Sequence, residues 1–231
     1  MKNCIPLLLL VFASAATSFA TPPTGQIHIG WAMTSITPEQ PVALAGQFHK
    51  RISERVESPC TATVLAIETR KGEQSLEQAI MVSCDLVLIA DHLQPRLRKM
   101  LAGRLPGFDP KKLFLNATHT HTGPVTRAIG WYTVDDKGVM KPPAYVDFML
   151  KKIAAAIESA WTNRAPGGVS WGLGHAVVGS NRRMVYRTAQ GQPPFGGGTA
   201  KMYGSNKTPD FLSVEGSEDT GIEMLFFWNT K

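Results

Sequence analysis

Cysteine is scarce in this sequence, and the scarcity excludes a disulfide-dependent scaffold. The 231 residues contain only three cysteines, and Cys4 lies just before an N-terminal apolar run. A small exported fold held together by disulfide bonds needs more cysteines than Cys60 and Cys84, the two that lie outside this N-terminal segment. These two residues allow either one disulfide bond or two free thiols. A buried free thiol is as reasonable for Cys84, because the surrounding segment is apolar.

Several functional motifs are also missing. The one G-x-S-x-G match, residues 168–172 (GVSWG), overlaps a predicted strand at 169–178 and does not stand at a strand-to-helix turn, which disfavours a serine hydrolase of that type. The three glycines at 196–198 are not followed by Lys and Ser or Thr, so a nucleotide phosphate loop is disfavoured as well. Basic residues exceed acidic ones by 24 to 18 but do not alternate with aromatic residues. We therefore expect no nucleic-acid partner, and at most a weak peripheral attraction to anionic membrane surfaces.

The N-terminal apolar run is too short to be a membrane span. Residues 5–12 are apolar, whereas a helix that crosses a bilayer needs about 20 such residues. Lys2 precedes the run, and small residues follow it up to Ala20, as in a secretory signal peptide. We therefore predict that residues 1–20 are a signal peptide. Cleavage near Ala20 would export residues 21–231 to the periplasm or the exterior.

Apolar patterns in the rest of the chain predict an α/β fold. Residues 61–69 and 78–89 are rich in Val, Ile and Leu and predict two adjacent buried strands. Apolar residues at helical spacing predict a helix at 91–102, and 113–117 predict the next strand. This strand, helix, strand order predicts a parallel pair. Similar patterns predict a helix at 144–161, a strand at 169–178 and a final core strand at 221–228. The expected core is a mixed, partly parallel sheet flanked by helices.

Two of the six histidines stand one residue apart, just after the predicted strand 113–117. They are His119 and His121, within the stretch His-Thr-His-Thr. Ligands of α/β proteins bind beyond the carboxyl ends of parallel strands. In extended backbone these side chains would project to the same side, where they could converge on one zinc ion. The alternative, supported equally, is that both imidazoles are only hydrogen-bonded to their neighbours.

Other polar residues near strand ends have two interpretations. Asp85 follows an apolar run, and it either orients a metal-bound histidine or accepts a hydrogen bond from a loop or helix end. Asn181, Arg182 and Arg183 follow the predicted strand 169–178. Their side chains either bind a carboxylate or phosphate group or are simply solvated.

Four stretches, in this order, resemble the N-terminal catalytic domain of the neutral/alkaline, non-lysosomal ceramidase family. They are residues 34–47 (TSITPEQPVALAGQ), residues 79–89, residues 116–124 (NATHTHTGP) and Asn181-Arg182-Arg183. The resemblance covers most of residues 26–228. It implies a zinc-dependent amidohydrolase that cleaves the N-acyl bond of ceramide or a related N-acylated substrate.

The resemblance also implies roles for individual residues. His119 matches the first zinc-binding histidine of the family, and His121 matches the next position of the motif, which contacts the substrate carbonyl or the tetrahedral oxygen. Asn181 and Arg182 match a segment near the active site. Together with Asp85 as a supporting residue, these are the predicted site residues.

The sequence departs from the family pattern in two ways. Thr122 stands where the family often has Ser, and Val125 and Thr126 replace glycines. The second zinc-binding histidine, the zinc-binding glutamate and tyrosine and the serine nucleophile of the family find no match in this chain. Since catalytic zinc normally takes three protein ligands, we expect residues 21–231 to be an incomplete part of a larger catalytic domain.

Two non-catalytic alternatives remain. The chain could be a remnant or a binding module of the same fold that lacks the downstream catalytic residues. An exported carbohydrate-binding domain is a weaker alternative. It depends only on three tryptophans as stacking surfaces: Trp31, Trp131 and Trp171.

Overall fold

The computed structural model describes residues 25–128, 130–192 and 197–230. The predicted signal peptide, residues 1–20, lies outside the described residues. The chain forms two compact units, with the boundary after Ala165. No helix among the described residues is both long and apolar enough to cross a membrane.

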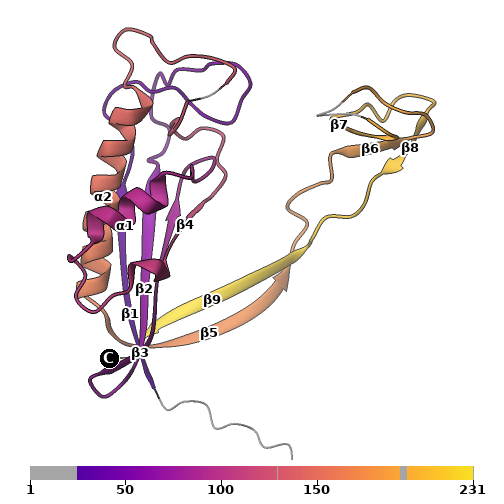
Figure 1. Ribbon diagram of the computed structural model, residues 1–231. Coiled ribbons are helices and arrows are strands. Elements are labelled where there is room, and N and C mark those ends of the chain that lie inside the picture. Colours follow the sequence, from indigo (N-terminus) through magenta and orange to yellow (C-terminus); the bar gives the residue numbers. More distant parts are fainter. Residues whose placement is uncertain (1–24, 129, 193–196, 231) are drawn as a thin grey trace, which may run out of the picture. The chain divides into compact units, whose positions relative to one another are not determined.

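The first unit contains a mixed sheet with two helices. In chain order its elements are β1 (Gln26–Ser35), β2 (Thr61–Lys71), β3 (Gln74–Cys84), α1 (Leu93–Leu101), a short 3-10 helix (Pro110–Lys112), β4 (Leu113–Ala117) and α2 (Pro142–Thr162). The strands lie in the order β4-β3-β2-β1 (Figure 1). β1 pairs with β2, and β2 with β3, in antiparallel fashion, whereas β3 and β4 are parallel. The predicted mixed, partly parallel α/β fold is confirmed.

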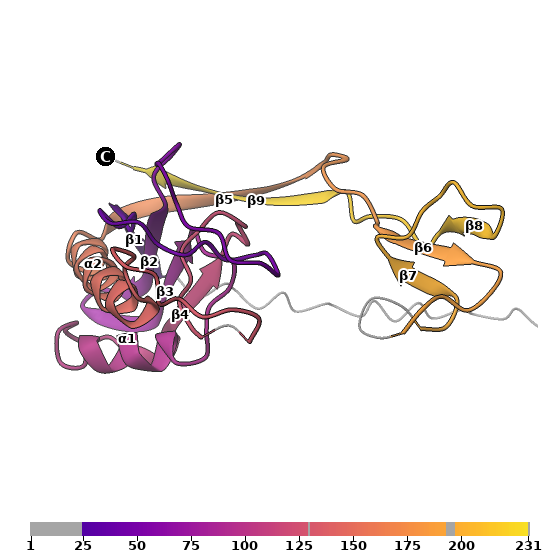
Figure 2. The same cartoon turned by 90° about the horizontal axis from the view of Figure 1, so that it is seen from above.

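The two helices cover one face of this sheet (Figure 2). Ala62, Val64 and Ala66 of β2 point into the core and are fully buried. On β1, Gly30 allows close packing, because a Cβ atom there would lie 2.0 Å from the carbonyl oxygen of Ala160 in α2. The strands predicted at 61–69 and 78–89 are observed as the adjacent strands β2 and β3, each buried on one face. Met81 on the opposite face of β3 is 48% exposed, since both helices pack on the same side.

The second unit consists of two separate pairings of strands. β5 (Ala165–His175) is antiparallel to β9 (Gly221–Asn229). A small sheet has the order β7-β6-β8, built from β6 (Arg183–Tyr186), β7 (Ala200–Met202) and β8 (Phe211–Val214).

The predicted final strand is confirmed, but its predicted place in a core is wrong. Leu225 and Trp228 of β9 are 64% and 56% exposed. The partner positions on β5 explain part of this exposure. Trp228 pairs with Gly168, and Met224 pairs with Gly172, so these glycines offer no side chain to cover the large residues beside them.

Candidate metal centre

The histidine motif lies in a turn beyond β4, so the prediction that it continues an extended strand is wrong. His119 has a left-handed backbone, with φ +63°. The physical reason is the end of the neighbouring strand. The Thr118 amide donates to the carbonyl oxygen of Cys84 at 3.0 Å. Because β3 ends at Cys84, residues beyond Thr118 have no ladder to follow.

The two imidazoles nevertheless converge. Nε2 of His119 lies 3.3 Å from Nε2 of His121, and the ring planes are inclined at 74°. Nδ1 of His119 lies 2.6 Å from the carbonyl oxygen of Val87. A carbonyl oxygen can only accept, so this nitrogen carries the hydrogen of the neutral ring and leaves Nε2 with a free lone pair. Nε2 of His121 is then the donor between the rings.

This geometry fits a zinc ion. Two nitrogen ligands at the usual Zn–N distance in a tetrahedral site lie about 3.3 Å apart, which is the separation of the His119 and His121 nitrogens. Nδ1 of His119 is already held by a backbone oxygen, as in most zinc-binding histidines. Within the described residues, no cluster of three or more His, Cys, Asp or Glu side chains could hold a metal ion. The pair therefore offers Nε2 of His119 as one ligand, and Nε2 of His121 as a second only when the hydrogen of that ring moves to Nδ1.

Gly46 and Arg51 hold the backbone around His121. Gly46 has φ +93°, and a Cβ atom there would lie 2.5 Å from Cγ of His121. Only glycine fits this position. The guanidinium group of Arg51 donates to the carbonyl oxygens of Ala45 and His121. Sequence reasoning found Gly46 only within the family-like stretch 34–47, and it missed Arg51 entirely.

The imidazole pair lines a cavity of about 610 Å³, referred to below as the imidazole cavity. Its apolar wall includes Ala45, Phe48, Val87, Leu88, Val125 and Trp131. The rings of Phe48 and Trp131 make an edge contact, with centroids 4.7 Å apart. An apolar wall beside two imidazoles suits a substrate with an apolar portion next to a polar reacting group.

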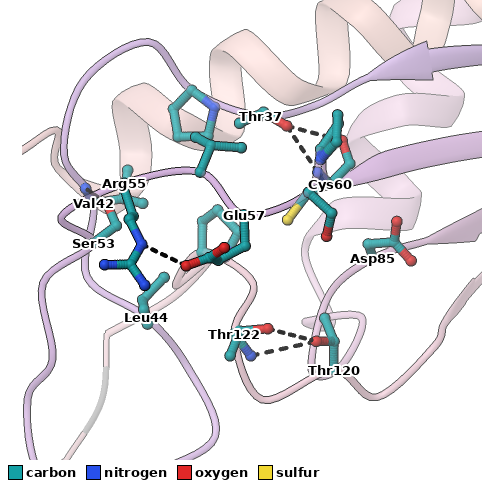
Figure 3. Close-up of a pocket in the computed structure, with 15 residues that line it drawn as sticks. Thr37, Val42, Leu44, Ser53, Arg55, Glu57, Cys60, Asp85, Thr120 and Thr122 are labelled. Carbon is teal, nitrogen blue, oxygen red and sulfur yellow. Dashed lines mark hydrogen bonds and ion pairs between the residues drawn. The ribbon is translucent and has the colours of Figure 1, made fainter.

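The threonines of the same motif face a different cavity, of about 520 Å³ (Figure 3). Thr120 and Thr122 line it, and their hydroxyl groups lie 3.0 Å apart. The stretch His-Thr-His-Thr therefore forms a wall between two cavities, with imidazoles on one side and hydroxyl groups on the other. The alternation of His and Thr thus places the two residue types on opposite sides of this wall, although the backbone is not an extended strand.

Asp85 lines the threonine side of this wall (Figure 3). One carboxylate oxygen accepts from the amide and the hydroxyl of Thr61, at 2.8 and 2.9 Å. The other accepts from the hydroxyl of Thr118 at 3.2 Å. Among the described residues its hydrogen bonds go to these two threonines and to neither imidazole. Thr118 directly precedes His119, so Asp85 could help to position His119 only through its hydrogen bond with Thr118. The supporting role of Asp85 stays a prediction.

Cys60 and Cys84, the two cysteines among the described residues, are free thiols. Burial, together with the nearby charge of Asp85, raises the pKa of Cys84 to about 12. Burial also raises the pKa of the half-buried Cys60. Neither thiol is therefore expected to act as a nucleophile near neutral pH.

Asn181 and Arg182 belong to the second unit, where they have local contacts. The Asn181 side chain accepts from the Arg183 amide at 2.9 Å and donates to the carbonyl oxygen of Gly216 at 3.3 Å. Arg182 lies 5.1 Å from the ring centre of Tyr203. Their predicted roles at the active site stay predictions.

Comparison with solved structures identifies the fold. No family model matches the sequence, and no curated protein matches it either. The structure is similar to the crystal structure of neutral ceramidase from Pseudomonas aeruginosa, with a TM-score of 0.56 and 20% identity over 70% of this chain. A ceramidase complexed with C2 gives a TM-score of 0.54 and 19% identity, again over 70% of this chain. The fold is ceramidase-like. The chain spans 25% of the length of each of these ceramidases.

Proposed function

We propose that this chain is part of an exported, zinc-dependent amidohydrolase that cleaves the N-acyl amide bond of ceramide or a related lipid-like substrate. The observation that carries the proposal is the pair of His119 and His121 nitrogens, 3.3 Å apart in a partly apolar cavity. The ceramidase-like fold supports the reaction class. The pattern of residues 1–20 supports export and a periplasmic or secreted location.

Each residue of the pair has a separate role in this proposal. When bound, zinc supplies a Lewis acid that polarises the amide carbonyl group and lowers the pKa of an attacking hydroxyl group or water. His119 offers Nε2 as its ligand, because the Val87 carbonyl group fixes the tautomer. His121 has its hydrogen on Nε2, so it can donate to the oxygen of the substrate carbonyl as negative charge develops there.

The remaining predicted site residues have supporting roles. Asp85 holds Thr118 and so the start of the turn that carries His119. For Asn181 and Arg182 we propose only what the resemblance of their segment implies, a place near the active site. Apolar side chains such as Phe48 and Trp131 give the imidazole cavity a surface for an acyl chain.

The test measures zinc-dependent release of octanoate from a short N-octanoyl amide by the purified exported chain. We expect hydrolysis that needs zinc and falls at least about 100-fold in His119→Ala, as expected when a ligand of catalytic zinc is removed. The matched control is His92→Ala. His92 is an exposed histidine of the same unit that makes no side-chain cap at α1, so this variant should keep the activity.

One observation favours the alternative of a non-catalytic remnant or binding module. The described residues contain no third ligand for the metal centre. A binding module would bind the amide without hydrolysing it, and His119→Ala would leave amide binding unchanged. Zinc-loaded wild-type protein that binds but releases no octanoate would overturn the hydrolase proposal in favour of this alternative.

A further inference from the structure

Arg127 differs from the other arginines of the first unit, because it has no ion-pair or hydrogen-bond partner among the described residues. Five of these arginines pair with carboxylates, namely Arg55, Arg70, Arg96, Arg104 and Arg164. Arg51 and Arg98 donate to backbone carbonyl oxygens. Among the described residues of this unit, Arg127 is the one arginine with neither kind of contact, and its side chain is exposed. Its charge is therefore available to a ligand.

Arg127 lies in the wall of the imidazole cavity. It also lines a neighbouring cavity of about 610 Å³, together with His92 and Arg96. Among the described lining residues of both cavities there is no Asp or Glu. Arg96 is paired with Asp147, so the unpaired positive charge on these walls is that of Arg127, and it favours an anionic group over a neutral or cationic one.

We propose that the substrate is an N-acylated amino acid, whose carboxylate binds Arg127. This inference rests on the proposed amidohydrolase function and makes its substrate class specific. Such a molecule has three parts that match the cavity. Its acyl chain suits the apolar wall, its amide suits the imidazole pair, and its carboxylate can take two parallel hydrogen bonds from a guanidinium group. A neutral N-acyl sphingoid base would cover the guanidinium group of Arg127 without supplying a counter-charge.

A matched pair of ligands tests the inference by calorimetry on the full exported chain. N-octanoylglycine and N-octanoylethanolamine share the acyl chain and the amide and differ in the carboxylate. We expect wild-type protein to bind the glycine conjugate about tenfold more tightly, the usual size of a charge-assisted contact. Arg127→Gln should remove this preference by weakening only the glycine conjugate. Arg127→Lys should keep part of it, because lysine retains the charge without the planar fork.

The control variant is Arg55→Gln. Arg55 pairs with Glu57 and lines the threonine-side cavity instead, so the preference should persist. Equal affinity for both ligands, no binding of either, or a preference that survives Arg127→Gln would overturn the inference. Hydrolysis separates this failure from failure of the proposed function. Equal cleavage of both conjugates would leave an amidohydrolase without the carboxylate preference. An Arg127-dependent preference for the glycine conjugate without cleavage of either conjugate would contradict only the proposed amidohydrolase function.

Discussion

Gly46 lies directly against His121. A Cβ atom added to Gly46 would come within 2.5 Å of Cγ, 2.7 Å of Cβ and 2.8 Å of Cα of this histidine. The loop cannot easily shift away, because Arg51 donates to the carbonyl oxygens of both Ala45 and His121. A second hydrogen bond joins the same two loops, since the Ala45 amide donates to the carbonyl oxygen of Gly123 at 2.9 Å. The position of the His121 ring is therefore set by a residue without a side chain.

Gly46→Ala should move His121 and weaken metal binding. The added methyl group clashes with the imidazole, and the backbone at φ +93° is unfavourable for alanine. We expect the zinc affinity to fall at least about tenfold and the free energy of unfolding to fall by about 1–3 kcal/mol. Zinc titration and urea unfolding measure the two effects.

The matched control is Gly72→Ala in the turn between β2 and β3. Gly72 also has a positive φ, +59°, but a Cβ atom there meets nothing within 4 Å. This variant should lose about 1 kcal/mol of stability from backbone strain alone and bind zinc like the wild type. A Gly46→Ala protein with unchanged zinc affinity would show that Gly46 does not position His121.

Asp85→Asn should destabilise the fold at the carboxyl end of β3. The amide group of asparagine would place donor hydrogens against Thr61 or Thr118, whose groups now donate to the carboxylate. We expect the free energy of unfolding to fall by about 1–3 kcal/mol, and zinc affinity to fall several-fold through Thr118. Thr118→Val isolates the second effect, because it removes only the Thr118 hydroxyl contact. Stability equal to that of the wild type would contradict this account of Asp85.

Much of the first unit could be predicted from its apolar pattern. The strand at 113–117 and the helices near 91–102 and 144–161 are observed as β4, α1 and α2. In each of these elements the apolar residues recur at the spacing that places them on one buried face. The end of β3 at Cys84 could not be predicted in this way. The apolar run continues to Ile89 because Leu86 enters the core from a loop, and burial alone does not distinguish a loop residue from a strand residue.

The sequence predicted the site residues whose side chains would carry the chemistry, but it did not predict the backbone contacts that position them. The convergence of His119 and His121 agrees with the expectation, but it arises from a left-handed turn instead of an extended strand. The carbonyl group of Val87 could not be found from the sequence, because every residue has one. Arg51 was missed for a similar reason, since it contacts backbone oxygens that no pairing of residue types reveals.

Glu68 gives the first unit a specific sensitivity to acid. Its side chain is 4% exposed and lies 2.9 Å from Arg164 and 2.8 Å from Arg70. Burial raises the pKa of Glu68, but hydrogen bonds from Ser75, Arg164 and Arg70 outweigh burial and hold it below the usual value. A carboxyl group whose pKa is lowered by folding stabilises the fold above its unfolded pKa, and this stabilisation is lost as the pH falls through the folded pKa.

We therefore expect wild-type stability to decline as the pH is lowered below about 4.5, the usual range of a glutamate. Glu68→Gln should lose about 3 kcal/mol at neutral pH, because it leaves Arg164 buried without its counter-charge. It should also show a flatter stability profile in acid. Urea unfolding at a series of pH values measures both effects, and parallel profiles for the two proteins would contradict the role of Glu68.

The two thiols should differ in reactivity. The pKa of Cys84 is raised to about 12, so almost no thiolate exists near pH 8 and alkylation by iodoacetamide should be undetectable in the native protein. Cys60 is half-buried and should react slowly. Both should react at once in denaturant without a reductant. Failure of both thiols to react under those conditions would indicate a disulfide bond instead of the free thiols observed.

The central claim is that zinc binds at the imidazole pair, with His119 as its ligand and His121 beside it, and zinc binding to the purified exported chain tests it most directly. Isothermal titration would compare wild-type protein with the His119→Ala, His121→Ala double variant and with the His92→Ala control. We predict one zinc ion per chain in the wild type and the control, and at least about a tenfold loss of affinity in the double variant. Zinc that binds equally well to the double variant, or a folded wild-type chain that binds none, would contradict the claim.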